Sequence, residues 1–82
     1  MELTIRVGSS HPILSREAAD IAMKMSRFES QVLIRKKDLT VNAKSLIGIM
    51  SLGLTSGQAV TILTEGKDEA EAACELSQLL GA

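Results

Sequence analysis

Hydrophobic and polar residues alternate at the start of the chain and then change to a helical spacing. Leu3, Ile5 and Val7 alternate with polar residues, which is the period of a strand with one buried face, and we expect this strand over residues 2 to 8. A loop containing Gly, Ser, His and Pro interrupts the alternation. From Ser15 onwards, apolar residues recur at the spacing of one helical face. The buried face predicted for this helix consists of Ala18, Ile21, Ala22 and Met25.

The rest of the chain predicts three more strands and two more helices. A tight turn at Lys36-Lys37-Asp38 separates two strands, and Gly53 ends a short helix because glycine accepts the left-handed conformation after a helix. A last helix starts near Asp68, with acidic residues at its positive N-terminal end. The three strands are marked by Val32 and Ile34, by Leu39 and Val41, and by Val60 and Ile62 with Leu63. The last helix is marked by Ala73, Leu76 and Leu80.

The order of the predicted elements is strand, helix, strand, strand, helix, strand, helix. In so short a chain this order favours an antiparallel sheet with its helices on a single face. We therefore predict an α+β fold, an open-faced sandwich of four antiparallel strands and three helices, formed by one domain over residues 1–82. A domain of this size buries only roughly 60–65% of the surface that its unfolded chain exposes, so its function must lie on the surface.

The short central helix carries more apolar residues than one buried stripe can hold. At about 100° per residue, its apolar side chains span well over half of the circumference, so at least one must point outward. An outward aliphatic or Met side chain is a candidate partner contact. It is equally consistent with the apolar area that every protein leaves exposed. These residues are Leu46, Ile47, Ile49 and Met50.

Ser45 stands where the central helix begins. Serine is a favoured N-cap because its hydroxyl accepts a hydrogen bond from one of the first free backbone N–H groups. A phosphate on the same hydroxyl would meet these N–H groups and the positive end of the helix dipole. Ser45 is thus either a plain cap or a phosphorylation switch, and the spacing alone fits both.

Composition and charge exclude several classes of function. The net charge is -1, with nine basic and ten acidic residues, and the chain has one Phe and neither Trp nor Tyr. It therefore lacks both the positive field and the aromatic platforms of a nucleic-acid-binding surface. The run Arg35-Lys36-Lys37 is short, and we interpret it as a solvated turn.

The sequence predicts neither a metal site nor a cofactor site. Cys74 is the single cysteine, which excludes an internal disulfide and a site built from cysteines alone, and its helical context favours a core or boundary position. No segment approaches the roughly 18 to 20 consecutive apolar residues needed to span a bilayer, and no secretion signal precedes the first strand. We expect a cytoplasmic protein.

Several segments carry a resemblance to a known family. The stretch 44–54 resembles the regulatory-serine helix of HPr, the histidine-containing phosphocarrier of the bacterial sugar phosphotransferase system, in its Gram-positive form. The segments 41–45, 53–57 and 65–70 extend the similarity over nearly the whole chain. The resemblance implies the same open-faced sandwich that the pattern predicts.

The catalytic segment of that family is altered in this chain. In HPr proteins a Gly-(Ile/Leu)-His-Ala-Arg-Pro-Ala motif precedes the first helix, and its histidine carries the phosphoryl group. Counted back from Ser45 without a gap, this motif falls on residues 12–18, and Leu14 takes the place of the histidine. Arg16 retains the arginine, whereas Pro12 and Glu17 replace the glycine and the proline. The resemblance therefore implies a non-catalytic protein, because leucine cannot accept phosphate.

The family resemblance also implies partners. In Gram-positive HPr and in histidine-lacking HPr-like proteins of catabolite repression, the serine matching Ser45 is phosphorylated by the HPr kinase/phosphorylase. The phosphorylated form then binds a LacI/GalR-type transcription regulator. Residues matching Arg16, Ile47 and Met50 lie on the face used with such partners, and Leu14 would extend it. Neither direct nucleic-acid binding nor membrane binding is implied.

Two other functions remain open. The first is an atypical phosphocarrier that uses His11, the single histidine. Pro12, which follows it, restricts the local backbone to an extended conformation. The second is an unmodified interaction module that binds a partner, or a second copy as a homodimer, through Leu14, Ile47 and Met50. Leu14 could instead fold inward as a hydrophobic staple on the first helix.

Overall fold

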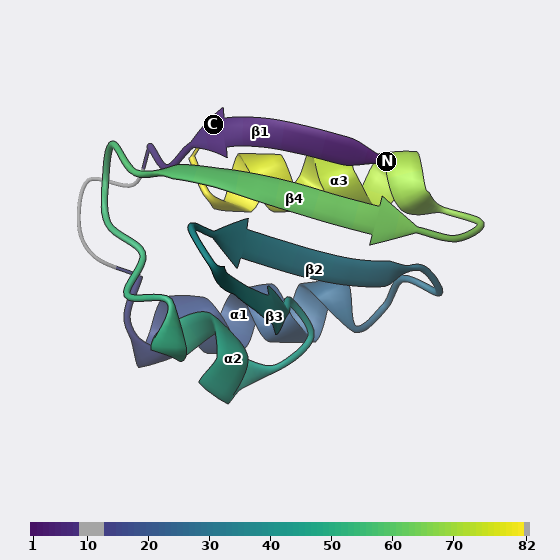
Figure 1. Cartoon of the computed structure of the whole chain (residues 1–82). Coiled ribbons are helices and arrows are strands. Elements are labelled where there is room, and N and C mark those ends of the chain that lie inside the picture. The colour runs from purple at the N-terminus through teal and green to yellow at the C-terminus, as the bar shows by residue number, and fades with distance from the viewer. Residues whose placement is uncertain (9–12, 82) are drawn as a thin grey trace.

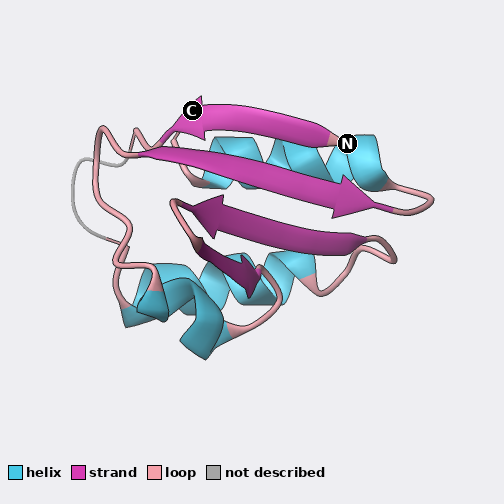
Figure 2. Cartoon of the chain, viewed as in Figure 1, coloured by secondary structure: helices cyan, strands magenta, loops and turns pink. Residues whose placement is uncertain are grey.

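The computed structural model describes residues 1–8 and 13–81 and contains four strands and three helices in the predicted order (Figures 1 and 2). His11 and Pro12 lie outside the described residues. The elements are β1 (Glu2–Arg6), α1 (Ser15–Met25), β2 (Gln31–Lys36), β3 (Leu39–Asn42), α2 (Leu46–Ser51), β4 (Ala59–Glu65) and α3 (Glu69–Leu79).

The strands form one antiparallel sheet in the order β1-β4-β2-β3. The C-terminal strand β4 lies in the middle of the sheet, where Ile62 pairs with Leu3 of β1 on one side and with Ile34 of β2 on the other. All three helices cover the same face of the sheet, with α3 behind β1 and β4 and with α1 and α2 near β2 and β3 (Figure 1). The predicted α+β open-faced sandwich is confirmed.

The core lies between the sheet and the helices. The four residues predicted for the inner face of α1 are buried, as are the predicted residues of α3. In the two central strands the alternate residues Val32, Ile34, Val60 and Ile62 are at most 2% exposed. One hydrophobic cluster joins all of these elements, because the sheet and helices present their apolar sides to the same layer.

The buried face predicted for the first strand is only partly covered at Leu3, and Leu39 in β3 is exposed as well. Leu3 in β1 and Leu39 in β3 are 37% and 47% exposed. Both strands lie at an edge of the sheet and have a neighbouring strand on one side only. The alternation therefore gives the correct face of the strand, but an edge position leaves that face partly uncovered.

The basic run at the β2–β3 turn is only partly a solvated turn. Lys37 and Asp38 form the connection, and Lys37 adopts the left-handed backbone conformation with φ of 55°. Lys36, in contrast, is half-buried, and its Nζ donates a hydrogen bond of 2.7 Å to the carbonyl oxygen of Leu52. Because Leu52 is the C-cap residue of α2, this hydrogen bond connects the end of that helix to β2.

Asp68 joins the start of α3 to the start of β2. Its carboxylate accepts hydrogen bonds from the backbone N–H groups of Glu29 (3.0 Å) and Ser30 (2.9 Å) and from the Ser30 hydroxyl. Ser30 is buried, and its hydroxyl oxygen accepts a bond from the Asp68 N–H. The Ser30 hydroxyl, followed by the N–H of Glu29, lowers the pKa of Asp68 from 3.8 to about 2, because these donors favour the charged carboxylate.

Candidate functional site

The first turn of α2 is organised by Ser45, as the sequence predicts. Ser45 is the N-cap residue, and its Oγ accepts a hydrogen bond of 3.2 Å from the N–H of Gly48. Its own backbone N–H donates to the carbonyl oxygen of Asn42 (3.0 Å), and its carbonyl oxygen accepts from Ile49 (3.0 Å). The side chain is half-buried, so the hydroxyl is held in place while part of the residue faces solvent.

Gly48 allows this turn to lie close to the end of β3. A Cβ at this position would stand 3.3 Å from the Asn42 carbonyl oxygen, from the Ser45 Cβ and from the Val41 Cβ. These distances are shorter than most contacts of real Cβ atoms, so a larger residue would push the cap away from the strand. A glycine inside a short apolar helix is a signal of such a close approach that can be found in the sequence.

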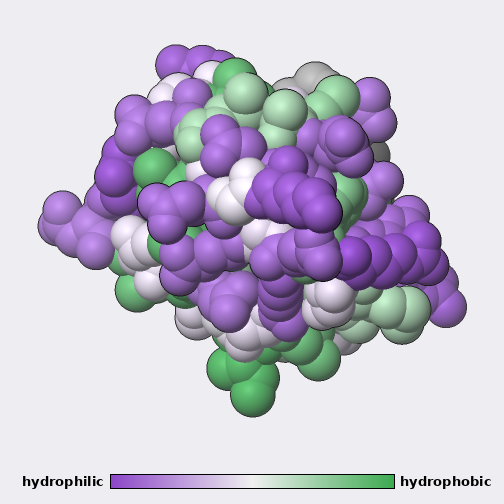
Figure 3. All heavy atoms as spheres, turned by 90° about the vertical axis from the view of Figure 1, so that its right-hand side faces the viewer, coloured by the Kyte–Doolittle hydropathy of each residue, from purple (hydrophilic) through white to green (hydrophobic). Residues whose placement is uncertain are grey.

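The apolar side chains of α2 divide between the core and the solvent. Ile49 is fully buried, whereas Ile47 is 79% exposed and Met50 is 44% exposed. Leu46 is 39% exposed and adds apolar area on the same helix. Figure 3 shows strongly hydrophobic atoms projecting from the lower edge of the molecule, the edge at which α2 lies in Figure 1. The expected outward residues on this helix are confirmed.

Leu14 is the N-cap residue of α1 and points outward. Its side chain is 62% exposed, so the staple interpretation, in which it folds inward, is wrong. Its backbone N–H donates to Oε1 of Glu17 at 3.1 Å, which satisfies one of the free donors at the start of the helix. Arg16 lies in the first turn and is also exposed. The start of α1 therefore exposes both an apolar side chain and a basic residue.

Contacts on both sides of α2 hold it against α1. The N–H of Ile13 donates to the carbonyl oxygen of Leu54, which joins the residue before α1 to the segment after α2 (2.8 Å). At the other end, Nζ of Lys44 donates to the carbonyl oxygen of Phe28, just beyond α1 (2.7 Å). The ammonium group of Lys44, the residue before Ser45, is thus directed to this carbonyl oxygen.

Within residues 1–8 and 13–81, no group of three or more His, Cys, Asp and Glu side chains could hold a metal ion. No helix in that part of the chain is long and apolar enough to cross a membrane.

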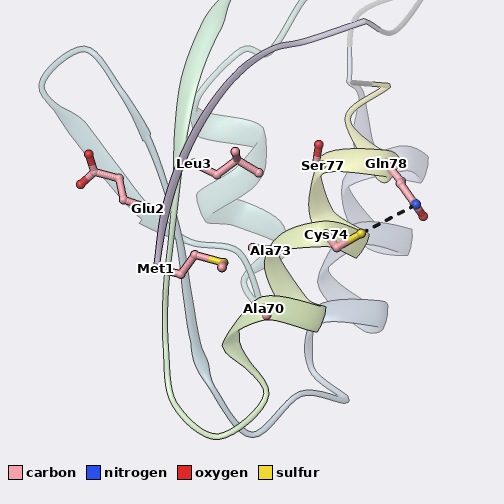
Figure 4. A pocket seen from close by; sticks show the side chains of 8 residues that line it. All are labelled: Met1, Glu2, Leu3, Ala70, Ala73, Cys74, Ser77 and Gln78. Atoms are coloured by element: carbon pink, nitrogen blue, oxygen red, sulfur yellow. Dashed lines mark hydrogen bonds between the residues drawn. The ribbon is translucent and has the colours of Figure 1, made fainter.

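A groove of about 460 Å³ lies between β1 and α3 (Figure 4), and its lining contains none of the predicted site residues. Leu3 points from β1 towards α3, and Cys74 is exposed on the helix rather than in the core. The candidate site is therefore a surface formed by α1 and α2.

Comparison with known proteins identifies close relatives. The whole chain, residues 1–82, matches the family model described as the PTS HPr component phosphorylation site. Over 72 residues it is 40% identical to the HPr-like protein Crh of Halalkalibacterium halodurans, an alignment that covers 88% of this chain and 86% of that protein.

Solved structures agree with this match. The phosphocarrier protein HPr from Bacillus anthracis has a TM-score of 0.91 at 37% identity, covering 96% of this chain and 94% of that one. The Bacillus subtilis catabolite repression protein Crh has a TM-score of 0.76 at 36% identity, covering 93% and 83% of the two chains. Its crystal structure is described as an intertwined, domain-swapped dimer.

Proposed function

The chain belongs to the HPr family, and we propose that it is a regulatory, non-catalytic member of this family that is controlled through Ser45. One observation carries the proposal: the position that holds the phosphorylated histidine in the family motif is the exposed Leu14, whereas the serine that matches the regulatory serine is present. A leucine side chain has no nucleophile for phosphoryl transfer. Recognition by other proteins is then the remaining role of this surface.

Phosphorylation of Ser45 by an HPr kinase/phosphorylase would change the charge of this surface without refolding it. A phosphate adds about -1.5 to -2 charges near pH 7 and can form one to three charge-assisted hydrogen bonds. The ammonium group of Lys44 is bound to the Phe28 carbonyl oxygen. The phosphate would add its charge beside the exposed apolar residues of α2, where basic groups of a partner can bind it.

The proposed partner is a LacI/GalR-type transcription regulator in carbon catabolite control. Support comes from the relatives, since the Bacillus subtilis Crh is described as a catabolite repression protein. Leu14, Ile47 and Met50 supply exposed apolar area, and Arg16 supplies a positive charge. Such a mixture of adaptable apolar contacts and charge suits a regulated interface. We place this activity in the cytoplasm.

The assignment is tested by offering the chain two phosphoryl donors in parallel. With HPr kinase and ATP, we expect acid-stable label that is absent in Ser45→Ala and retained in the matched control Ser51→Ala. With phosphoenolpyruvate and enzyme I, we expect no label. Acid-labile label from phosphoenolpyruvate that disappears in His11→Ala would contradict the proposal and establish the atypical phosphocarrier.

An unmodified interaction module is the second candidate, and the 79% exposure of Ile47 favours it. An exposed large aliphatic side chain can bind a partner whether or not Ser45 is modified. This candidate predicts that a partner binds the unphosphorylated chain as tightly as the phosphorylated chain.

Self-association is a further part of the proposal. Dimers are described for relatives in this family, including an HPr from Thermoanaerobacter tengcongensis and the Crh of Bacillus subtilis. We propose that this chain forms a homodimer at high concentration, which sedimentation equilibrium would detect. A chain that remains monomeric at millimolar concentration would contradict it.

A further inference from the structure

Among the residues that the structure describes, no strand pairs with the outer edge of β1. β1 is the last strand of the sheet and pairs with β4 on one side only (Figure 1). Sheet edges are usually protected by short strands, charged side chains, Pro or bulges, because free N–H and C=O groups can pair with another chain. β1 has five residues, Glu-Leu-Thr-Ile-Arg, and contains no Pro. Its two charged residues have opposite signs, so they can attract those of a second antiparallel copy. The other edge strand, β3, is shorter and packs beside α2.

The hydrogen bonds between β1 and β4 show which residues face that free edge. Met1 and Thr64 exchange backbone hydrogen bonds, and the N–H of Val7 donates to the carbonyl oxygen of Gln58. Because bonding direction alternates along an antiparallel strand, Leu3 and Ile5 also direct their N–H and C=O groups to β4. The backbone groups of Glu2, Thr4 and Arg6 therefore point outward from the sheet.

These three residues are self-complementary. If two β1 strands pair antiparallel with Thr4 opposite Thr4 of the second copy, Glu2 faces Arg6 of the second copy, and Arg6 faces its Glu2. Both opposite-charge pairs then lie on the open face of the sheet, where directly opposed cross-strand charges attract. Arg6 uses Nη1 for a bond to the Gly57 carbonyl oxygen (2.8 Å), which leaves its other guanidinium N–H groups for the carboxylate.

The opposite side of the same strand is apolar. Leu3 is 37% exposed and points towards α3 at the groove, while Glu2 points away from that helix (Figure 4). Met1, Ala70 and Ala73 complete the apolar part of this groove. In the antiparallel arrangement Leu3 faces Ile5 of the second copy, so apolar area that the monomer leaves partly open is covered on the helical side.

We propose that the β1 edge is a homodimer surface, in which two copies join Glu2–Arg6 edge to edge, without exchanging strands, into one continuous sheet. The proposal specifies the surface of the proposed self-association, and it is independent of Ser45. In a swapped dimer, by contrast, β1 would leave its own β4 and pair with the β4 of the partner.

Charge exchange at the edge provides the test. By sedimentation equilibrium, Glu2→Arg and Arg6→Glu are each expected to raise the dimer dissociation constant roughly tenfold or more, because each places like charges opposite one another twice. The double variant E2R/R6E restores the pairs and should dimerise like the original chain. An equimolar mixture of the two single variants should form a heterodimer.

Proline substitutions at the two edges of the sheet provide a second test and its matched control. Thr4→Pro removes an outward N–H at the centre of the proposed interface and should abolish the dimer, since proline is tolerated at a strand edge but cannot donate. Thr40→Pro makes the same change in β3 and should leave the dimer unchanged. Circular dichroism of both variants establishes that the monomer remains folded.

Two results would overturn the proposal. A chain that is monomeric at millimolar concentration contradicts both this surface and the proposed self-association. A dimer that persists unchanged in Arg6→Glu and Thr4→Pro contradicts edge pairing alone and leaves self-association standing. Neither result affects the Ser45 proposal, which the phosphorylation assay tests separately.

Discussion

At the scale of single residues, Ser45 contributes to stability before any modification takes place. Its hydroxyl satisfies the Gly48 N–H, so Ser45→Ala leaves this donor without its cap. We expect the free energy of unfolding to fall by about 0.5–2 kcal/mol, measured by urea denaturation. Ser51→Ala is the control, because the Ser51 hydroxyl donates to the Gly48 carbonyl oxygen at the exposed end of the same helix and should cost less. Equal losses in the two variants would contradict the capping role.

Asp68 predicts a pH dependence of stability. Its pKa is about 2 in the folded protein and near its ordinary value of 3.8 in the unfolded chain. A lowered pKa stabilises the folded state above the unfolded value, and this contribution is lost as the pH falls from about 4 through 2. Stability should therefore decrease with falling pH in this range.

The Asp68 contribution is measured by urea denaturation between pH 2 and 5. Asp68→Asn should be less stable at pH 5 and should lose the part of the pH dependence that Asp68 supplies, because the amide cannot titrate. The pKa of Glu69 is also lowered, by its hydrogen bond from the Gly66 N–H, so this neighbour should keep a residual dependence. Asp38→Asn, in the exposed β2–β3 turn, is the control and should keep the pH dependence of the original chain. A slope that is unchanged in Asp68→Asn would contradict the assignment.

Single residues differ in how far the sequence predicts them. The cap at Ser45 and the helix end at Gly53, with φ of 58°, follow from local preferences that act within a few residues. The bonds of Asp68 to Ser30 and of Lys44 to Phe28 join residues 38 and 16 positions apart. Local patterns contain no signal for such contacts, because they depend on how the elements pack.

At the scale of secondary-structure elements, α2 contains one isoleucine that stabilises the fold and another that is exposed for recognition. Ile49 is fully buried and Ile47 is 79% exposed, although the two residues have the same side chain on the same helix. Ile49→Ala should lower the free energy of unfolding by about 2–5 kcal/mol, because it leaves a cavity in the core. Ile47→Ala should change it by no more than about 0.5 kcal/mol.

Binding to the partner should depend on the exposed Ile47 rather than on the buried Ile49. Ile47→Ala should weaken binding to the regulator while the protein remains folded, which calorimetry would detect. Binding that is unchanged in Ile47→Ala would remove α2 from the proposed interface.

The pattern of the chain predicts the type and order of every element, since each has the period of one buried face. It does not predict how completely that face is covered. Leu3 and Leu39 follow the same alternation as Ile62, yet they are exposed because their strands lie at the edges. Strand order is a property of the whole sheet. β4 is the last of the four strands along the chain, yet it lies inside the sheet between β1 and β2. The outward position of Leu14 is likewise decided by how α1 packs.

At the scale of the whole molecule, the two proposed surfaces lie on different sides. The β1 edge is at the top of Figure 1, whereas α2 is at the bottom. A charge added at Ser45 is therefore not in contact with the proposed dimer edge. Ser45→Asp should leave the dimer dissociation constant unchanged at physiological ionic strength, where charges more than about 8 Å apart are largely screened. A large shift would show that the two surfaces are coupled.

The central claim is that this surface is recognised through the charge state of Ser45. The most direct measurement is the affinity of a LacI/GalR-type regulator for the phosphorylated and the unphosphorylated chain, determined by calorimetry under identical conditions. The account predicts that the phosphorylated chain binds at least about tenfold more tightly, because charge-assisted bonds form only with the phosphate. Equal affinity of the two forms would contradict it.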